Sequence, residues 1–285
     1  MKQIEYNALP HQMKVLNSDK KFIFMGGGVG CGKTDVGSLW SLVKILDTPN
    51  DVRGLICANS YSQLIDSTLA NVYKNFKSWG VKLDPPEPPK THRPFNLRVF
   101  NGKNWVEIMC RSLDNFVMLS GVEVGWWWAD EVFQTKRNAI DLLNARLRDT
   151  RMKNQSLMTT TLDDPGTWMY EMFVDNHNSD LMEVLYAKTY DNEKNLPAGY
   201  IDALKSTYTE QMFRRMVMSE WVALDGQAIY YAFSRESNVT EDAEYQEGIP
   251  ILWSLDFNIG KGKPASSCLC HIKKGRGVNG EVQLE

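Results

Sequence analysis

Short apolar runs alternate with helix-period patterns along the chain as far as about residue 224. Strand patterns occupy residues 21–25, 53–58, 96–100, 105–110, 122–131 and 155–161, with an Asn-Gly turn between the third and the fourth. Apolar residues recur at helical spacing within residues 34–46, 62–79, 135–149 and 210–221. Strands that alternate with helices are typical of a mainly parallel sheet flanked by helices, so an α/β domain is predicted over residues 1–224.

The chain changes character after residue 224. Residues 225–248 are acidic and rich in turn-forming residues, which predicts a linker. A new strand pattern begins at residue 251, so residues 249–285 are predicted to start a second domain. Within the first domain, residues 84–94 carry five prolines, which indicates an extended surface loop.

A phosphate-binding pattern lies between the first strand and the first long helix. Residues 26–34 read GGGVGCGKT and contain G-x-x-x-x-G-K-[ST]. The glycines leave backbone N–H groups free to wrap phosphates, Lys33 can reach the β- and γ-phosphates, and the Thr34 hydroxyl can bind Mg²⁺. We therefore expect ATP and Mg²⁺ as ligands. The predicted nucleotide-binding residues of this loop are Gly27, Gly28, Gly30, Cys31, Gly32, Lys33 and Thr34.

A second pattern, VEVGWWWADE at residues 122–131, resembles the Walker B strand of phosphate-loop enzymes. Asp130 is expected to hold Mg²⁺ through water, and Glu131, on the opposite side of an extended backbone, to polarise the attacking water. A catalytic glutamate favours a hydrolase; the alternative is an acidic pair in a solvated turn. The three tryptophans are expected to pack a buried strand, with stacking on a base as the alternative.

The strands between the two motifs match the additional-strand, catalytic-glutamate type of P-loop NTPase. The strand at residues 155–161 ends in three threonines. Their hydroxyls either sense the γ-phosphate or belong to a β-branched strand with a polar end, and both interpretations stay open.

Composition sets limits on partners and location. The 285 residues carry a net charge of −3, so any contact with DNA must come from a local basic patch. The candidates for such contacts are Lys136, Arg137 and Lys153. No apolar stretch of about 18 residues is present, which argues against membrane insertion. The five cysteines are odd in number, with one in the phosphate loop, and are expected to be reduced.

The whole chain resembles the large subunit of a tailed-bacteriophage terminase. The resemblance rests on the two nucleotide motifs and on four further segments, at residues 9–12 (LPHQ), 144–148 (NARLR), 214–221 with 225–226, and 253–257 (WSLDF). It implies that Gln12 reads the adenine edge and that the chain is an ATP-hydrolysing motor moving double-stranded DNA into a procapsid. It also implies a homo-oligomeric ring, a portal protein and a small terminase subunit as partners, and a place in the host cytoplasm, transiently at the procapsid portal.

The chain departs from the family in its phosphate loop, where Val29 stands in place of an arginine found in many terminases. An arginine finger must then come from elsewhere. Arg146, Arg148 and Arg151 are the candidates, in the same subunit or supplied to a neighbour; otherwise they are surface arginines at a helix end.

The second departure concerns cleavage of DNA. Residues 249–285 look like the start of an RNase H-like nuclease, in which Asp256 matches the first metal-binding aspartate. Two-metal cleavage needs several converging carboxylates, and only Glu281 and Glu285 follow. We expect an incomplete nuclease, with two divalent metal ions and cleavage only where that domain is completed. The rival functions are a helicase-like ATPase on single strands and a non-motor nucleotide switch.

Overall fold

The computed structural model describes residues 6–224, 247–248, 251–256 and 266–271. The chain divides into two units, Met1–Asp225 and Gly226–Glu285. In the second unit, β9 (Ile251–Asp256) pairs antiparallel with β10 (Ser266–His271), and Asp256 is the last residue of β9. Most of the predicted linker lies outside the described residues, as do Glu281 and Glu285.

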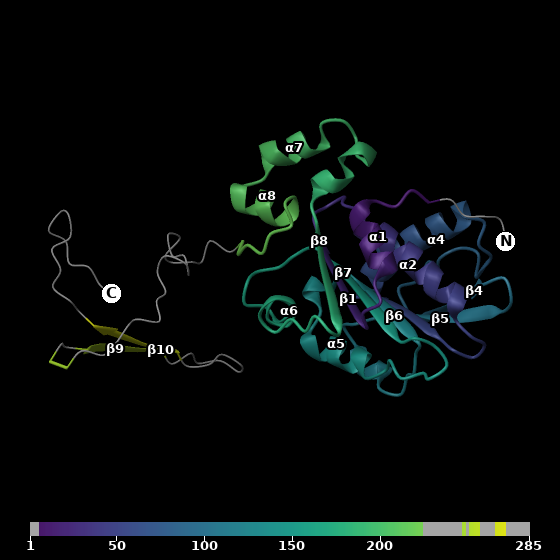
Figure 1. The fold of residues 1–285 in the computed structure, drawn as a ribbon, viewed down its shortest axis with the longest axis horizontal. Helices are drawn as coiled ribbons and strands as arrows, with labels where there is room; N and C mark the ends of the chain where they lie inside the picture. Colours follow the sequence, from purple (N-terminus) through teal and green to yellow (C-terminus); the bar gives the residue numbers. More distant parts are fainter. Residues whose placement is uncertain (1–5, 225–246, 249–250, 257–265, 272–285) are drawn as a thin grey trace. The chain divides into compact units, whose positions relative to one another are not determined.

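An eight-stranded sheet forms the centre of the first unit, in the order β3-β4-β5-β2-β6-β7-β1-β8 (Figure 1). Its strands are β1 (Phe22–Gly27), β2 (Gly54–Ala58), β3 (Leu83–Asp84), β4 (Phe95–Phe100), β5 (Trp105–Ser112), β6 (Trp126–Asp130), β7 (Gln155–Thr160) and β8 (Met182–Ala187). The strands from β5 to β8 in this order run parallel, while β3 and β4 are antiparallel additions at one edge. The predicted mainly parallel α/β sheet is confirmed.

Helices cover both faces of this sheet. The α-helices are α1 (Pro10–Asn17), α2 (Lys33–Asp47), α3 (Tyr61–Gln63), α4 (Ala70–Ser78), α5 (Arg137–Asn144), α6 (Trp168–Tyr170), α7 (Tyr200–Thr207) and α8 (Glu210–Met216). Two π-helical segments, η1 (Leu64–Leu69) and η4 (Glu171–Asp175), and three 3₁₀ segments, η2 (Phe116–Leu119), η3 (Val132–Gln134) and η5 (Thr189–Asn195), complete the first unit. Figure 1 shows α1, α2 and α4 on one face of the sheet and α5 and α6 on the other. None of the described helices is long and apolar enough to cross a bilayer.

Alternation along the central strands divides the core between the two faces. Trp126 and Trp128 belong to the cluster under α2 and α4, whereas Trp127 belongs to the cluster over α5. All three tryptophans are fully buried, and the indole N–H of Trp128 donates to Thr159 Oγ1 at 2.9 Å. Their predicted role in packing is confirmed.

Two predicted helices are shorter than their sequence patterns. The pattern at 135–149 gives α5, which ends at Asn144, after which Leu147 bridges back to Val124. The pattern at 210–221 gives α8, which ends at Met216, and the backbone of the following segment is left-handed at Ser219, with φ of 57°. In both places tertiary contacts override helical periodicity.

Candidate active site

The phosphate loop connects the end of β1 to the start of α2, as predicted. Gly30 and Gly32 have φ of 73° and 91°, a left-handed conformation that glycine adopts without a steric cost. The turn leads directly into α2, whose first N–H groups have no acceptor within the helix. It borders a cavity of about 580 Å³, whose loop-derived lining is Val29, Gly30, Gly32, Lys33 and Thr34.

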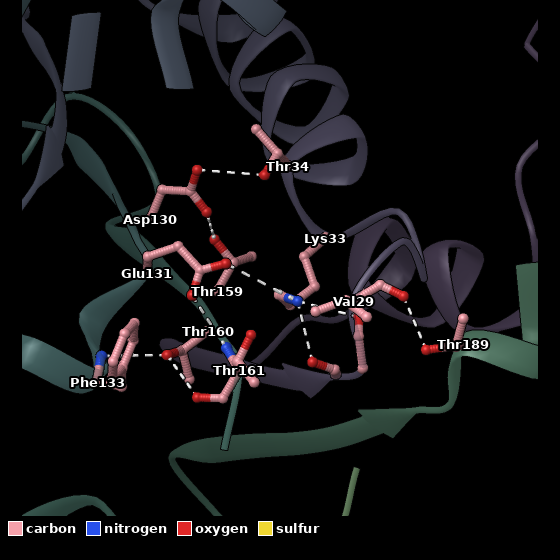
Figure 2. A network of polar contacts seen from close by, with 12 residues as sticks. Val29, Lys33, Thr34, Asp130, Glu131, Phe133, Thr159, Thr160, Thr161 and Thr189 are labelled. Carbon is pink, nitrogen blue, oxygen red and sulfur yellow. Dashed lines mark hydrogen bonds and ion pairs between the residues drawn. The ribbon is translucent and has the colours of Figure 1, made fainter. Parts of the chain in front are cut away.

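Lys33 is buried where the two nucleotide motifs meet. Its Nζ donates to the carbonyl oxygens of Gly27 and Gly28, at 2.9 and 3.1 Å. The same atom lies 3.9 Å from Oε1 of Glu131 (Figure 2). The structure therefore brings the lysine of the first motif to the glutamate of the second.

Asp130 ends β6 and is 1% exposed. Three hydroxyls donate to its carboxylate, from Thr34 at 3.3 Å, Thr68 at 2.9 Å and Thr159 at 2.7 Å. Burial and, second, the Glu131 carboxylate raise the pKa of Asp130 to about 6. A threonine hydroxyl beside a buried carboxylate is an oxygen donor set that suits Mg²⁺, so Thr34 and Asp130 fit the predicted metal site.

Glu131 corrects one sequence-based expectation. The sequence pattern predicts an extended backbone for it, but β6 ends at Asp130 and Glu131 has φ of 51°, in the left-handed region. This turn points the carboxylate towards the phosphate loop, where Oε1 faces Lys33 and Oε2 accepts a hydrogen bond from the Thr161 N–H at 3.1 Å. Such a conformation is rare outside glycine and is found at functional sites.

The three threonines at the end of β7 have different surroundings. The Thr159 hydroxyl donates to Asp130, and the Thr160 hydroxyl accepts from the Phe133 N–H at 3.1 Å and donates to the Thr161 carbonyl at 2.8 Å. Of the three, Thr161 lines the cavity. A contact with the γ-phosphate thus fits Thr161, while Thr159 supports the Asp130 carboxylate and Thr160 ties Thr161 to the segment after β6.

Gln12 lies at the cavity wall, as the adenine-reading prediction requires. Its Oε1 accepts hydrogen bonds from the Leu9 N–H at 2.9 Å and the Tyr6 hydroxyl at 3.3 Å. Its Nε2 donates to the Gly32 carbonyl at 3.1 Å, so the side chain also braces the phosphate loop. Adenine recognition by Gln12 stays a prediction.

Behind the loop, His11 and Cys31 pack together. A ring nitrogen of His11 lies 2.9 Å from the Cys31 carbonyl, and burial lowers the pKa of His11. Cys31 is fully buried, and burial raises the pKa of its thiol. Gly30 and Gly32 line the cavity, whereas Cys31 is buried behind the loop and is not part of the cavity wall.

Sequence reasoning missed several lining or supporting residues. Thr68 comes from the π-helical segment η1, and Asn192 and Asn195 from the 3₁₀ segment η5. Asn192 donates to the Gly30 carbonyl at 2.7 Å. These residues lie far along the chain from both motifs, and no local pattern marks them.

The arginine candidates lie near the starts of the parallel strands, at the opposite strand ends from the cavity. Arg146 donates to the Ser120 carbonyl, and Arg148 donates to Glu123 at 3.1 Å, in the segment before β6. Arg151 donates to the carbonyls of residues 50 and 51, before β2. The cavity lies where these parallel strands end, and among the described residues no arginine lines it. A finger role within the same chain does not fit this structure; a role in a neighbouring subunit stays a prediction.

The three basic candidates for DNA contacts are not gathered in one patch. Lys136 and Arg137 follow the end of β6, and the guanidinium of Arg137 pairs with Glu171 at 2.8 Å. Lys153 precedes the start of the parallel strand β7. The two groups therefore lie at opposite ends of the parallel strands.

Comparison with known proteins agrees with the geometry. A family model described as terminase large subunit, T4likevirus-type, N-terminal, matches residues 24–237. No curated protein matches the sequence.

The fold of this chain resembles that of solved terminase structures. The large terminase of a thermophilic bacteriophage, in complex with ADP, has a TM-score of 0.67 at 20% identity, covering 94% of this chain and 65% of that chain. The large terminase ATPase domain of Thermus phage P74-26 has a TM-score of 0.55 at 17% identity, covering 76% of this chain and 95% of that one. The chain therefore spans about two thirds of the length of the ADP-bound terminase and shares the fold of both proteins.

Proposed function

Because this chain belongs to the terminase large-subunit family, we propose that it hydrolyses ATP to drive double-stranded DNA into a phage procapsid. The observation that carries the proposal is the convergence of Lys33 and Glu131 at one cavity, with Asp130 buried beside it and hydrogen-bonded to Thr34. Their contacts join two motifs that are nearly a hundred residues apart, as the hydrogen bond between Thr34 and Asp130 spans 96 positions. This convergence favours a hydrolase over a passive nucleotide binder.

The chain's own residues supply three parts of the proposed mechanism. The first turn of α2 offers N–H donors to the phosphates, and Lys33 neutralises charge on them. Thr34 and Asp130 would hold Mg²⁺, which supplies further positive charge to the phosphates when bound. Glu131 orients and deprotonates the attacking water, since its carboxylate is held beside Lys33 by the Thr161 N–H.

Partners and location follow from the family and form part of the proposal. We expect double-stranded DNA, the portal protein and the small terminase subunit as partners, and a ring of identical subunits when the motor is assembled. The place of action is then the host cytoplasm, transiently at the procapsid portal. Asp256, at the end of β9, remains our candidate for the first metal ligand of a nuclease site, whose two metal ions need further converging carboxylates.

Steady-state ATP hydrolysis by the purified chain tests the proposal. We would measure it without DNA, with single-stranded DNA and with linear duplex, using Glu131→Gln as the blank. The proposal expects turnover that duplex DNA stimulates most, and a Glu131→Gln variant that still binds ATP but loses at least about 99% of turnover.

The rival functions give different results in the same assay. Stimulation mainly by single strands would favour a helicase-like ATPase. Tight ATP binding with equally slow hydrolysis by wild type and Glu131→Gln would favour a nucleotide switch and overturn the motor proposal.

A further inference from the structure

The end of α8 makes contacts with the chain that leaves β7. Arg215 is 8% exposed, and its Nε donates to the Leu162 carbonyl at 2.8 Å. The two other guanidinium nitrogens donate to Asp164 at 2.6 Å and Asp163 at 2.5 Å. One planar fork thus fixes three consecutive residues directly after the threonines of the site.

The residues that follow Arg215 hold the phosphate loop. The Met216 carbonyl accepts from the Val29 N–H at 2.7 Å. The Val217 carbonyl accepts from the Thr189 N–H at 2.9 Å, and the Thr189 hydroxyl donates to the Val29 carbonyl at 2.7 Å (Figure 2). The packing is close, since a Cβ added to Gly28 would lie 2.7 Å from the Val217 carbonyl oxygen.

Arg215 therefore holds the residue that directly follows Thr161, whose N–H orients Glu131. The N–H of Thr161 donates to the Glu131 carboxylate, and the next residue, Leu162, is the one whose carbonyl Arg215 holds. Hydrogen bonds between a buried guanidinium and carboxylates are strong and directional. The Thr161 N–H is consequently fixed in place by a side chain that lies outside both nucleotide motifs.

We propose that Arg215 is a positioning residue for the hydrolysis, which acts through Thr161 on the Glu131 carboxylate; this inference rests on the proposed function. Asp163 and Asp164 are its partners in this role. Asp164 also accepts a hydrogen bond from the Leu224 N–H at 3.1 Å, next to the end of the first unit. The same contacts thus join the water-orienting carboxylate, the phosphate loop and the chain's exit towards the second unit.

The test is a comparison of Arg215→Lys with Arg214→Lys in the purified chain. Lysine keeps the positive charge beside the two aspartates and removes the fork. Arg214 is the matched control, because it neighbours Arg215 on α8 but is exposed and pairs with Glu220. We expect kcat for ATP to fall about tenfold or more in Arg215→Lys, with KM and ADP affinity within about threefold of wild type, and no change in Arg214→Lys.

A merely structural role gives a different pattern. Loosening of the phosphate loop would weaken ADP binding in parallel with kcat, and that result, or an unchanged kcat, would overturn the inference. Thermal unfolding identifies a variant that fails to fold; in that event Asp163→Asn, which removes one of the two carboxylates, takes its place with the same expected split.

Amide hydrogen exchange separates this inference from the proposed function. In Arg215→Lys, a peptide covering residues 159–164 should exchange about tenfold faster, and peptides from β4 and β5 at the wild-type rate. If wild type hydrolysed no ATP, the proposed function would fail, and unchanged exchange at 159–164 would separately show that Arg215 does not hold this segment.

Discussion

At the residue scale, Glu131 combines a strained backbone with two restraining contacts. Its left-handed conformation, with φ of 51°, costs roughly 1–2 kcal/mol for a residue with a side chain. The Thr161 N–H and the Lys33 ammonium hold the carboxylate on one side of that turn. A residue kept in an unfavourable conformation where an extended one would be cheaper indicates that the carboxylate position matters for activity.

This strain predicts a difference between two inactive variants. Glu131→Gln and Glu131→Asn both remove the carboxylate, but asparagine tolerates a left-handed backbone better than glutamine does. We expect both variants to lose hydrolysis. The free energy of unfolding of the asparagine variant should exceed that of the glutamine variant by up to about 1 kcal/mol. Urea denaturation of the two proteins side by side measures this. Equal stability would mean that the backbone of Glu131 is not strained in solution.

At the scale of elements, the site forms because parallel strands deliver their ends to one edge of the sheet. β1 leads into the phosphate loop, β6 ends at Asp130 with Glu131 next, and β7 ends at Thr160 with Thr161 next. The π-helical segment η1 adds a contact from the helical layer, through Thr68. π-helical turns inside helices are frequent at functional sites.

Thr68 accordingly predicts an effect on Asp130. Thr68→Val removes a hydroxyl that donates to a buried carboxylate, whereas Thr68→Ser keeps it. We expect Thr68→Val to lower the free energy of unfolding by about 1–2 kcal/mol and to raise the Mg²⁺ concentration needed for half-maximal hydrolysis. Chemical denaturation and a Mg²⁺ titration of turnover measure the two effects. A serine variant as impaired as the valine variant would show that shape, and not the hydroxyl, is what Thr68 supplies.

The same elements explain which parts of the site the sequence predicts. The phosphate loop and the Asp130-Glu131 pair are each contiguous, so their local pattern is sufficient to identify them. Thr68, Asn192 and Arg215 reach the site through tertiary packing, and nothing in their local sequence marks them. The left-handed turn at Glu131 is likewise not predicted, because the pattern of apolar residues indicates where β6 runs but not the backbone angles after its last residue.

At the scale of the whole molecule, the cavity and the arginine candidates lie at opposite ends of the parallel strands. β6 has five residues, and a strand of that length spans about 16 Å. Arg146 and Arg148 contact the segment before this strand, while Glu131 follows it. In a head-to-tail ring each subunit presents one surface to a different surface of its neighbour. If Arg146 or Arg148 is the finger, this separation means that it acts on the cavity of a neighbouring subunit, which a head-to-tail ring would allow.

Subunit mixing tests this arrangement. The double variant Arg146→Ala/Arg148→Ala keeps an intact nucleotide site, and Glu131→Gln keeps both arginines. If either arginine acts in a neighbouring subunit, each protein alone should lose about tenfold or more of the turnover, and their mixture should recover part of it at concentrations that allow assembly. Arg98→Ala, which changes an exposed arginine on β4 paired with Asp84, serves as the matched control in the same mixtures. A double variant as active as wild type would assign both residues to the surface, and a mixture no more active than its components would exclude their action in a neighbouring subunit. Either result would leave the arginine finger to another part of the assembled motor.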